Sequence, residues 1–237
     1  MKLLVLAGGF GTRLKTAITD VPKALAPIGD VPFLQLQLEN WKAQGLRKFT
    51  FLLHHQADQI IDFLQAQQVG QLNDCEVDWL IESMPMDTGG ALAHAVKTLG
   101  LKDNFLMTNA DTWLGGGVSE VMQSAAPAMA VITLTEVSRY GQVHFDDKLC
   151  VTSFAEKKGL SAAGWINAGL CLLNVELFQE WDGQPFSLKR DLFGTLVQSR
   201  QLTAVPLKSD FIDIGIPADY HRFCRWIAAG RKDSLCN

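Results

Sequence analysis

The chain has 237 residues, of which 48% are hydrophobic and 19% are charged. This composition is typical of a globular protein with its own core and excludes an intrinsically disordered chain. The formal net charge of −4 argues against a broad nucleic-acid-binding surface, so any phosphate binding must depend on a few well-placed groups.

The cysteine spacing and the N-terminal segment predict the cellular compartment of the protein. The five cysteines lack the Cys-x-x-Cys spacing of zinc sites and predict no disulfide framework. The apolar run after Met1-Lys2 is too short for a signal peptide, and no run approaches the ~18 residues that cross a bilayer. We therefore expect a cytoplasmic protein that does not bind membranes.

Strand-like and helix-like segments alternate in the first half of the chain. The predicted strands are residues 2–7, 48–53, 76–81 and 104–108, and the predicted helices are residues 32–44, 58–67 and 88–99. Nearly continuous apolar strands that alternate with helices are typical of a mostly parallel sheet covered on both faces. The sequence therefore predicts an α/β fold.

The alternation changes after about residue 126. Four strand-like segments with short turns follow, and then two helices: residues 128–134, 141–145, 149–154 and 168–173, then 187–199 and 217–229. They predict a smaller antiparallel sub-sheet beside the first sheet. Because no linker or repeat interrupts the chain, we expect one domain over residues 1–237 with two lobes, at about 1–126 and 127–237.

The glycine-rich turn after the first strand is the strongest functional signal. The apolar strand breaks into Gly8-Gly9-Phe10-Gly11-Thr12-Arg13-Leu14, and Val21-Pro22-Lys23 follows. Glycines let the backbone turn tightly and present N–H groups to a ligand. Because Arg13 and Lys23 add fixed positive charge, the segment predicts a cradle for a nucleoside triphosphate.

This turn differs from two common phosphate-binding loops. A Walker loop ends in Gly-Lys-Ser/Thr, and the dinucleotide fingerprint needs a third glycine, where Leu14 stands. The segment instead resembles the signature Gly-Gly-x-Gly-Thr-Arg-Leu, followed by Pro-Lys, of the sugar-1-phosphate nucleotidyltransferases. The resemblance implies a Rossmann-like sheet flanked by helices, with a nucleotide-binding lobe at about 1–126 and a sugar-binding lobe at 127–237.

The resemblance implies that a nucleoside triphosphate and a sugar 1-phosphate react directly and release pyrophosphate. Since two anions are joined, the site needs positive charge and amides more than a nucleophilic side chain. Arg13 is suited to the leaving pyrophosphate through its planar fork, and Lys23 to the α-phosphate. The nucleotide-binding residues implied for this segment are Leu6, Ala7, Gly8, Gly9, Gly11, Thr12, Arg13 and Lys23.

Two aspartates complete the implied catalytic set with Arg13 and Lys23. Asp111 follows the predicted strand 104–108, and Asp213 stands in an Asp-x-Gly-x-Pro motif that resembles a late motif of the family. A lone aspartate at a strand end can also be a helix N-cap, so the metal assignment depends on the pair. The resemblance implies that Asp111 and Asp213 hold Mg²⁺, which prefers hard oxygen ligands.

Three residues resemble the segment of the family that recognises the base: Glu82, Thr88 and Gly89. An ionised carboxylate only accepts hydrogen bonds, and guanine offers two adjacent donors, N1–H and the 2-amino group. This favours guanine weakly. Capping of the predicted helix 88–99 is the alternative reading of Gly89.

The sugar-phosphate-binding residues implied by the resemblance are Asn109, Glu156, Lys157, Asn167 and Gly169. A solvated turn is the alternative reading for Lys157. Further along, Ser187-Leu188-Lys189 departs from the Ser-Leu-Glu pattern of the family. We assign no role to Lys189 from the sequence.

Within the family, the chain looks most like the heptose 1-phosphate guanylyltransferases. This implies GTP and D-glycero-D-manno-heptose 1-phosphate as substrates, with a product for surface polysaccharide synthesis. Mannose-1-phosphate guanylyltransferases and aminosugar-1-phosphate uridylyltransferases remain alternatives, and a homo-oligomer stays open.

Two hypotheses come from other classes of protein. A non-catalytic regulator that binds a nucleoside diphosphate sugar is disfavoured, because Arg13, Lys23 and both aspartates are present. An NAD-binding Rossmann protein is disfavoured by the missing third glycine.

Overall fold

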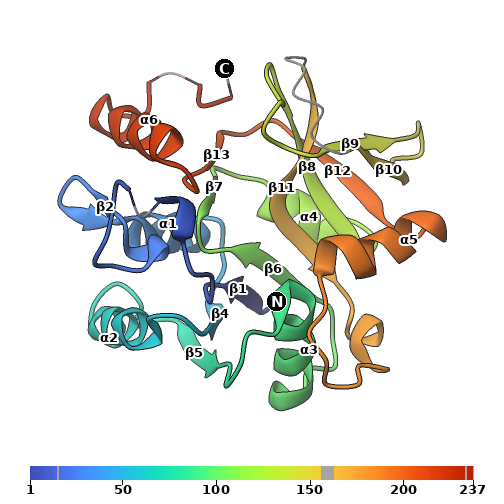
Figure 1. Cartoon of the computed structure of the whole chain (residues 1–237), viewed down its shortest axis with the longest axis horizontal. Helices are drawn as coiled ribbons and strands as arrows, with labels where there is room; N and C mark the ends of the chain where they lie inside the picture. Colours follow the sequence, from blue (N-terminus) through green and yellow to red (C-terminus); the bar gives the residue numbers. More distant parts are fainter. Residues whose placement is uncertain (15, 156–162, 233, 237) are drawn as a thin grey trace.

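One mixed β-sheet forms the centre of the molecule (Figure 1). The computed structural model describes residues 1–14, 16–155, 163–232 and 234–236. The strands of this sheet are β1 (Leu3–Leu6), β4 (Lys48–Leu53), β5 (Glu76–Ile81), β6 (Phe105–Asn109), β8 (Ala128–Leu134), β9 (Gln142–Phe145), β10 (Val151–Ala155), β11 (Gly164–Leu173) and β12 (Thr203–Leu207). Their order is β10-β9-β11-β6-β1-β4-β5, and β8 pairs with both β11 and β12.

The parallel half of the sheet contains the topological switch point. β1 pairs in parallel with β4 on one side and with β6 on the other, and β4 pairs in parallel with β5. Open α/β sheets bind their ligands outside the carboxyl ends of the strands at such a point. The glycine-rich turn leaves β1 at this position.

The antiparallel strands predicted for the second half are confirmed, and they continue the same sheet. β11 runs antiparallel to β6, with Cys171 opposite Met107, and antiparallel to β8, with Ile166 opposite Ile132. β9 and β10 form an antiparallel hairpin, and β12 lies parallel to β8. Because β11 pairs with β6, strands from the first and second halves of the chain share one sheet.

Helices cover both faces of the sheet. The longer ones are α1 (Phe33–Ala43), α2 (Ala57–Gln68), α3 (Asp87–Leu99) and α6 (Pro217–Ala228), and the short ones are α4 (Val118–Gln123) and α5 (Gly194–Gln198). Leu38 of α1 and Ile60 of α2 belong to one buried cluster, whereas Leu92 of α3 and Leu196 of α5 belong to another. Figure 1 shows α1 and α2 to the left of the sheet and α3 and α5 to the right.

A small second sheet lies beneath α6. It pairs β7 (Thr112–Leu114) with β13 (Phe211–Asp213) in antiparallel register, with Asp213 opposite Thr112. Trp113 is buried against Phe223 and Trp226 of α6, with ring centroids 5.4 and 6.0 Å away. This packing places the end of β13 beside the segment that follows β6.

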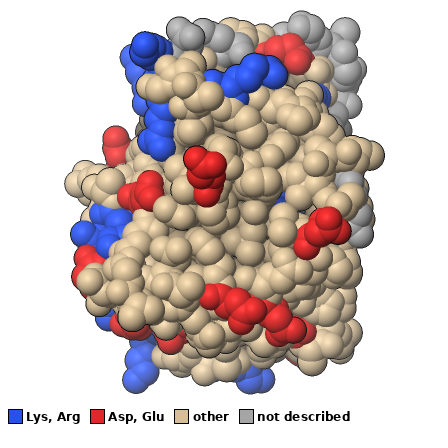
Figure 2. Space-filling model, turned by 90° about the vertical axis from the view of Figure 1, so that its left-hand side faces the viewer, with Lys and Arg blue, Asp and Glu red and all other residues tan. Residues whose placement is uncertain are grey.

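The remaining short strands, β2 (Pro27–Ile28) and β3 (Val31–Pro32), form a hairpin before α1. On the face shown in Figure 2, positive and negative side chains of the described residues lie in small separate groups. None of the helices in the described part of the chain combines the length and the apolar character needed to span a membrane.

Candidate active site

The glycine-rich turn lines a cavity of about 700 Å³. The Ala7 N–H donates to Leu52 O at 2.9 Å, and a Cβ atom placed on Gly8 would lie 3.1 Å from His54 Cβ. Gly11 has a φ of +59°, a left-handed conformation that favours glycine. Gly8 therefore permits close approach to β4, and Gly11 permits the turn.

The cavity brings together most of the residues predicted to form the site. They come from the ends of β1, β6 and β13, from the turn at Lys23–Leu25, from the connection after β5 and from the first turn of α3. They are Leu6, Ala7, Gly8, Gly9, Gly11, Thr12, Arg13, Lys23, Glu82, Thr88, Asn109, Asp111 and Asp213. The volume is within the roughly 300–1,000 Å³ range of small-molecule sites.

Lys23 lies between two carboxylates that line this cavity. Its ammonium donates to Asp111 and is 3.8 Å from Asp213 Oδ1, and its side chain is only 13% exposed. The Ile214 N–H donates to Asp111 O at 3.0 Å. This hydrogen bond and the β7–β13 ladder hold the two aspartates on either side of the ammonium.

Gly215 is a site residue that the sequence analysis did not select. A Cβ atom placed there would lie 2.6 Å from Asp213 Oδ1, 2.8 Å from Lys23 Nζ and 3.4 Å from Arg13 Nη2. Gly215 is not among the described glycines with positive φ, so space and not backbone conformation explains the missing side chain. Its N–H donates to Asp213 Oδ1 at 2.6 Å. The signal available in the sequence was the glycine of the Asp-x-Gly-x-Pro motif.

Gly215→Ala should lower turnover by about tenfold or more, because the added methyl displaces Lys23 or Asp213 from the preorganised centre. The measurement is kcat with saturating substrates, alongside the midpoint of thermal unfolding. Gly194→Ala is the matched control, since a Cβ atom at this helical glycine meets no atom within 4 Å. Equal kcat values for both variants would contradict the prediction.

The two aspartates influence each other electrostatically. Burial raises the pKa of the Asp213 carboxyl above its usual range, and the nearby Asp111 charge raises this pKa further. Lys23, the Gly215 N–H and Arg13 lower the pKa of Asp213 and so oppose this shift.

The two aspartates fit a magnesium site. Two close carboxylates at the edge of a phosphate-sized cavity fit Mg²⁺, which commonly takes one or two carboxylates and completes its shell with phosphates and water. Within the described residues, no group of three or more His, Cys, Asp or Glu side chains could hold a metal ion.

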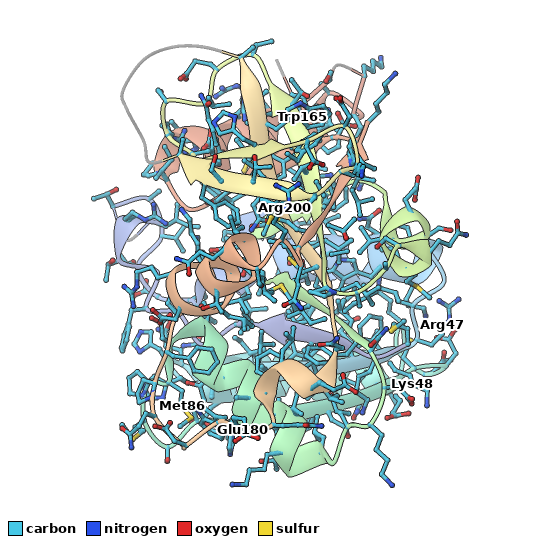
Figure 3. All side chains as sticks on the ribbon, turned by 90° about the vertical axis from the view of Figure 1, so that its right-hand side faces the viewer. Arg47, Lys48, Met86, Trp165, Glu180 and Arg200 are labelled. Atoms are coloured by element: carbon cyan, nitrogen blue, oxygen red, sulfur yellow. The ribbon has the colours of Figure 1, made fainter. Side chains whose placement is uncertain are left out.

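Glu82 lies at the other end of the cavity, just after β5. Its N–H donates to Leu53 O at 2.8 Å, and its Oε2 accepts from the Met86 N–H at 3.1 Å. Burial raises the pKa of the Glu82 carboxyl, and the Met86 hydrogen bond opposes this shift. Met86 is labelled near the lower end of the view in Figure 3, beside α3.

Thr88 lines the cavity, whereas Gly89 does not. The Gly89 N–H donates to Phe186 O at 2.9 Å, and a Cβ atom on Gly89 would lie 2.2 Å from Phe186 Cε2. The absence of a side chain at Gly89 therefore permits its close packing against Phe186.

Three predicted sugar-side residues meet where β6 and β11 pair. Gly169 has a φ of +80°, its N–H donates to Asn167 Oδ1 at 2.8 Å, and a Cβ atom on it would lie 3.3 Å from Asn109 Nδ2. Asn109 lines the cavity, and Asn167 and Gly169 do not. Glu156 and Lys157 lie outside the described residues.

The chain belongs to the nucleotidyl transferase family, whose sequence profile matches residues 2–230. The D-glycero-alpha-D-manno-heptose 1-phosphate guanylyltransferase of Campylobacter jejuni is 30% identical over 224 residues, which are 94% of this chain and 98% of the relative. The probable mannose-1-phosphate guanylyltransferase 1 of Oryza sativa is 31% identical over 230 residues, and the match covers 93% of this chain and 63% of that longer relative.

A solved structure is also similar to this chain, in fold as well as in sequence. The crystal structure of HddC from Yersinia pseudotuberculosis, complexed with GMP-PN, aligns with a TM-score of 0.82 at 30% identity. The alignment covers 95% of this chain and 99% of HddC. The expected family and the expected fold are confirmed.

Proposed function

We propose that the protein is a sugar-1-phosphate guanylyltransferase that converts GTP and a sugar 1-phosphate into a GDP-sugar and pyrophosphate. The observation that carries the proposal is the meeting of Arg13, Lys23, Asp111 and Asp213 at the end of the glycine-rich turn. The heptose 1-phosphate guanylyltransferase of Campylobacter jejuni and the probable mannose-1-phosphate guanylyltransferase of rice support the same reaction class.

The reaction needs no covalent intermediate with the protein. A phosphate oxygen of the sugar 1-phosphate attacks the α-phosphorus, and the bond to the bridging oxygen breaks as pyrophosphate leaves. The backbone N–H groups of residues 8–12 bind the triphosphate. Lys23 reduces the repulsion between the two anions, and Arg13 stabilises the charge that develops on pyrophosphate.

Asp111 and Asp213 would hold Mg²⁺, which supplies positive charge to the reacting phosphates when it is bound. The placement of the two carboxylates on either side of one ammonium at the cavity supports this assignment. Their proximity to Lys23 keeps all three charged groups on one side of the cavity.

Glu82 is the residue that we expect to select guanine. Its carboxylate lines the cavity, and Oε2 is already oriented by the Met86 N–H. An ionised carboxylate accepts two parallel hydrogen bonds from guanine N1–H and the 2-amino group, which adenine does not offer.

Glu82→Gln should lower kcat/KM for GTP about 10- to 100-fold, because a glutamine amide replaces one acceptor with a donor. Since burial raises the pKa of the Glu82 carboxyl, the neutral amide should leave thermal stability unchanged or increased. The measurement is kcat/KM for GTP and ATP. Glu120→Gln on the exposed side of α4 is the control, and an unchanged GTP preference in Glu82→Gln would contradict the prediction.

The acceptor that we propose first is D-glycero-D-manno-heptose 1-phosphate, with mannose 1-phosphate as the alternative. The relatives support both acceptors, and the heptose relative is matched over nearly its whole length. An aminosugar 1-phosphate with UTP is a third pair to test. A role in surface polysaccharide synthesis and a cytoplasmic location complete the proposal, and the five free cysteines fit a reducing compartment.

Pyrophosphate release tests the proposal directly. The purified protein is incubated with Mg²⁺, one of GTP, ATP, CTP, UTP or dTTP, and one sugar 1-phosphate at a time. Release with GTP and either heptose or mannose 1-phosphate supports the proposed reaction. Tight binding of a GDP-sugar without release from any pair would contradict it and favour a non-catalytic regulator.

A further inference from the structure

The His54 side chain connects the end of β4 to Glu82, the residue that we expect to select guanine. His54 immediately follows β4, and its Nδ1 lies 3.0 Å from Glu82 O. A backbone carbonyl only accepts hydrogen bonds, so Nδ1 carries the proton and donates it to Glu82. Both residues line the same cavity. The imidazole ring is therefore part of the cavity wall and is bonded to the backbone of Glu82.

The end of β4 binds both backbone polar groups of Glu82. The Glu82 N–H donates to Leu53 O at 2.8 Å, and its C=O accepts from His54. The β4–β5 ladder ends where Leu53 stands opposite Ile81, so Glu82 is the first residue beyond it. The hydrogen bond to the Glu82 C=O comes from a side chain, and it therefore depends on which residue follows Leu53.

These backbone bonds bear on the carboxylate, because the Glu82 side chain is buried and held at its far end too. Oε2 accepts from the Met86 N–H at 3.1 Å. Hydrogen bonds thus hold Glu82 at its N–H, its C=O and its carboxylate. Supporting bonds of this kind keep a binding group in its productive orientation before the ligand arrives.

The glycine-rich turn also contacts His54. The Phe10 ring packs edge-on against the His54 ring, with centroids 5.8 Å apart and an interplanar angle of 83°. A Cβ atom on Gly8 would lie 3.1 Å from His54 Cβ. Gly8 and Phe10 line the cavity as well. One histidine thus contacts both the turn that would bind the triphosphate and the residue that would bind the base.

We propose that His54 is a positioning residue whose Nδ1–H bond holds Glu82 in a fixed place relative to the glycine-rich turn and thereby sets the preference for guanine. This inference rests on the proposed function, in which Glu82 accepts from guanine N1–H and the 2-amino group. A fixed acceptor discriminates against an analogue that lacks a donor, because the acceptor is then left unpaired in a buried site. An acceptor that can turn away discriminates less.

The test compares the dissociation constants of GTP and ITP, measured by titration calorimetry with Mg²⁺ and without an acceptor. ITP differs from GTP only in the absence of the 2-amino group, so the ratio of the Kd for ITP to the Kd for GTP reports the hydrogen bond to that group. In His54→Leu this ratio should fall about tenfold, because the Glu82 backbone loses the His54 bond.

His54→Asn is the matched variant, since asparagine and leucine side chains have nearly the same shape. The asparagine Nδ2 is bonded to Cγ, as Nδ1 is in histidine, and it can donate to Glu82 O from the same place. The ITP-to-GTP ratio of His54→Asn should therefore stay within about twofold of the wild-type ratio. A role of His54 in packing alone would give both variants the same ratio.

His55→Leu is the control for the neighbourhood of the ring. The His55 ring also packs on Phe10, with centroids 5.2 Å apart, but His55 is not among the described residues that line the cavity. Its ratio should equal that of the wild type. At saturating GTP and acceptor, kcat of His54→Leu should stay within about threefold of wild type, since Arg13 and Lys23 are unchanged.

Three results would overturn this inference alone: an unchanged ratio in His54→Leu, an equal fall in His54→Asn, or an equal weakening of GTP and ITP binding in His54→Leu. Equal binding of GTP and ITP by the wild type would overturn the proposed role of Glu82, and this inference with it. If the ratios behave as expected but the wild type releases no pyrophosphate with GTP and any acceptor, the proposed reaction is wrong and the role of His54 in guanine binding stands.

Discussion

Arg13→Ala should lower kcat about 100-fold or more, because the variant loses a preorganised positive charge where pyrophosphate leaves. Arg13 Nη2 lies 3.4 Å from the position of a Cβ atom on Gly215, beside Lys23 and Asp213. The side chain is exposed, and no carboxylate of the described residues forms an ion pair with it. Its removal therefore leaves no buried charge without a partner. The measurement is kcat at saturating substrates and Mg²⁺, together with the midpoint of thermal unfolding, which should stay unchanged.

Two further variants separate charge from shape at this position. Arg13→Lys keeps the charge but loses the planar fork that binds two phosphate oxygens, so its kcat should lie between those of the wild type and Arg13→Ala. Arg225→Ala, on an exposed position of α6, should leave kcat unchanged. If Arg13→Ala retained the kcat of the Arg225 control, Arg13 would have no role in stabilising the leaving group.

The elements with strong hydrophobic patterns could be predicted from the sequence. The strands expected at residues 48–53, 76–81 and 128–134 begin and end where β4, β5 and β8 do. The helix expected at 32–44 is one residue longer than α1 at each end, and the helix expected at 88–99 begins one residue after α3 does. In these segments the spacing of the apolar residues matches the face that is buried in the fold, so tertiary packing does not shift the ends of the elements by more than a residue.

The short elements could not be predicted, since they have too few residues to show a period. β7 and β13 have three residues each, and α4 has six. Their positions depend on burial of Trp113 under α6 and on hydrogen bonds from α1: Gln37 Nε2 donates to Thr112 O at 2.8 Å, and Asn40 Nδ2 donates to Leu114 O at 2.7 Å. These contacts join segments far apart in the sequence.

The sequence motifs identify the charged residues of the site, but only the fold shows how these residues face one another. Lys23 and Asp111 meet because the Lys23 turn and the end of β6 border the same cavity. The space requirement at Gly215 and the approach of Lys189 to Gly141 are also tertiary facts. The sequence showed that Lys189 departs from the Ser-Leu-Glu pattern of the family, but not that its ammonium lies beside Gly141.

Asp111→Asn should lower kcat about 100-fold or more and raise the Mg²⁺ concentration needed for half-maximal activity. The asparagine keeps the shape of the side chain but removes the charge that pairs with Lys23, and Asp213 remains as the single carboxylate beside the ammonium. The measurement is a Mg²⁺ titration of pyrophosphate release at saturating GTP and acceptor. Asp103→Asn makes the same chemical change at an exposed position before β6 and should leave the titration unchanged. If Asp111→Asn matched this control in both kcat and Mg²⁺ dependence, the two-carboxylate metal site would be wrong, and charge neutralisation would have to come from Lys23 and Arg13 alone.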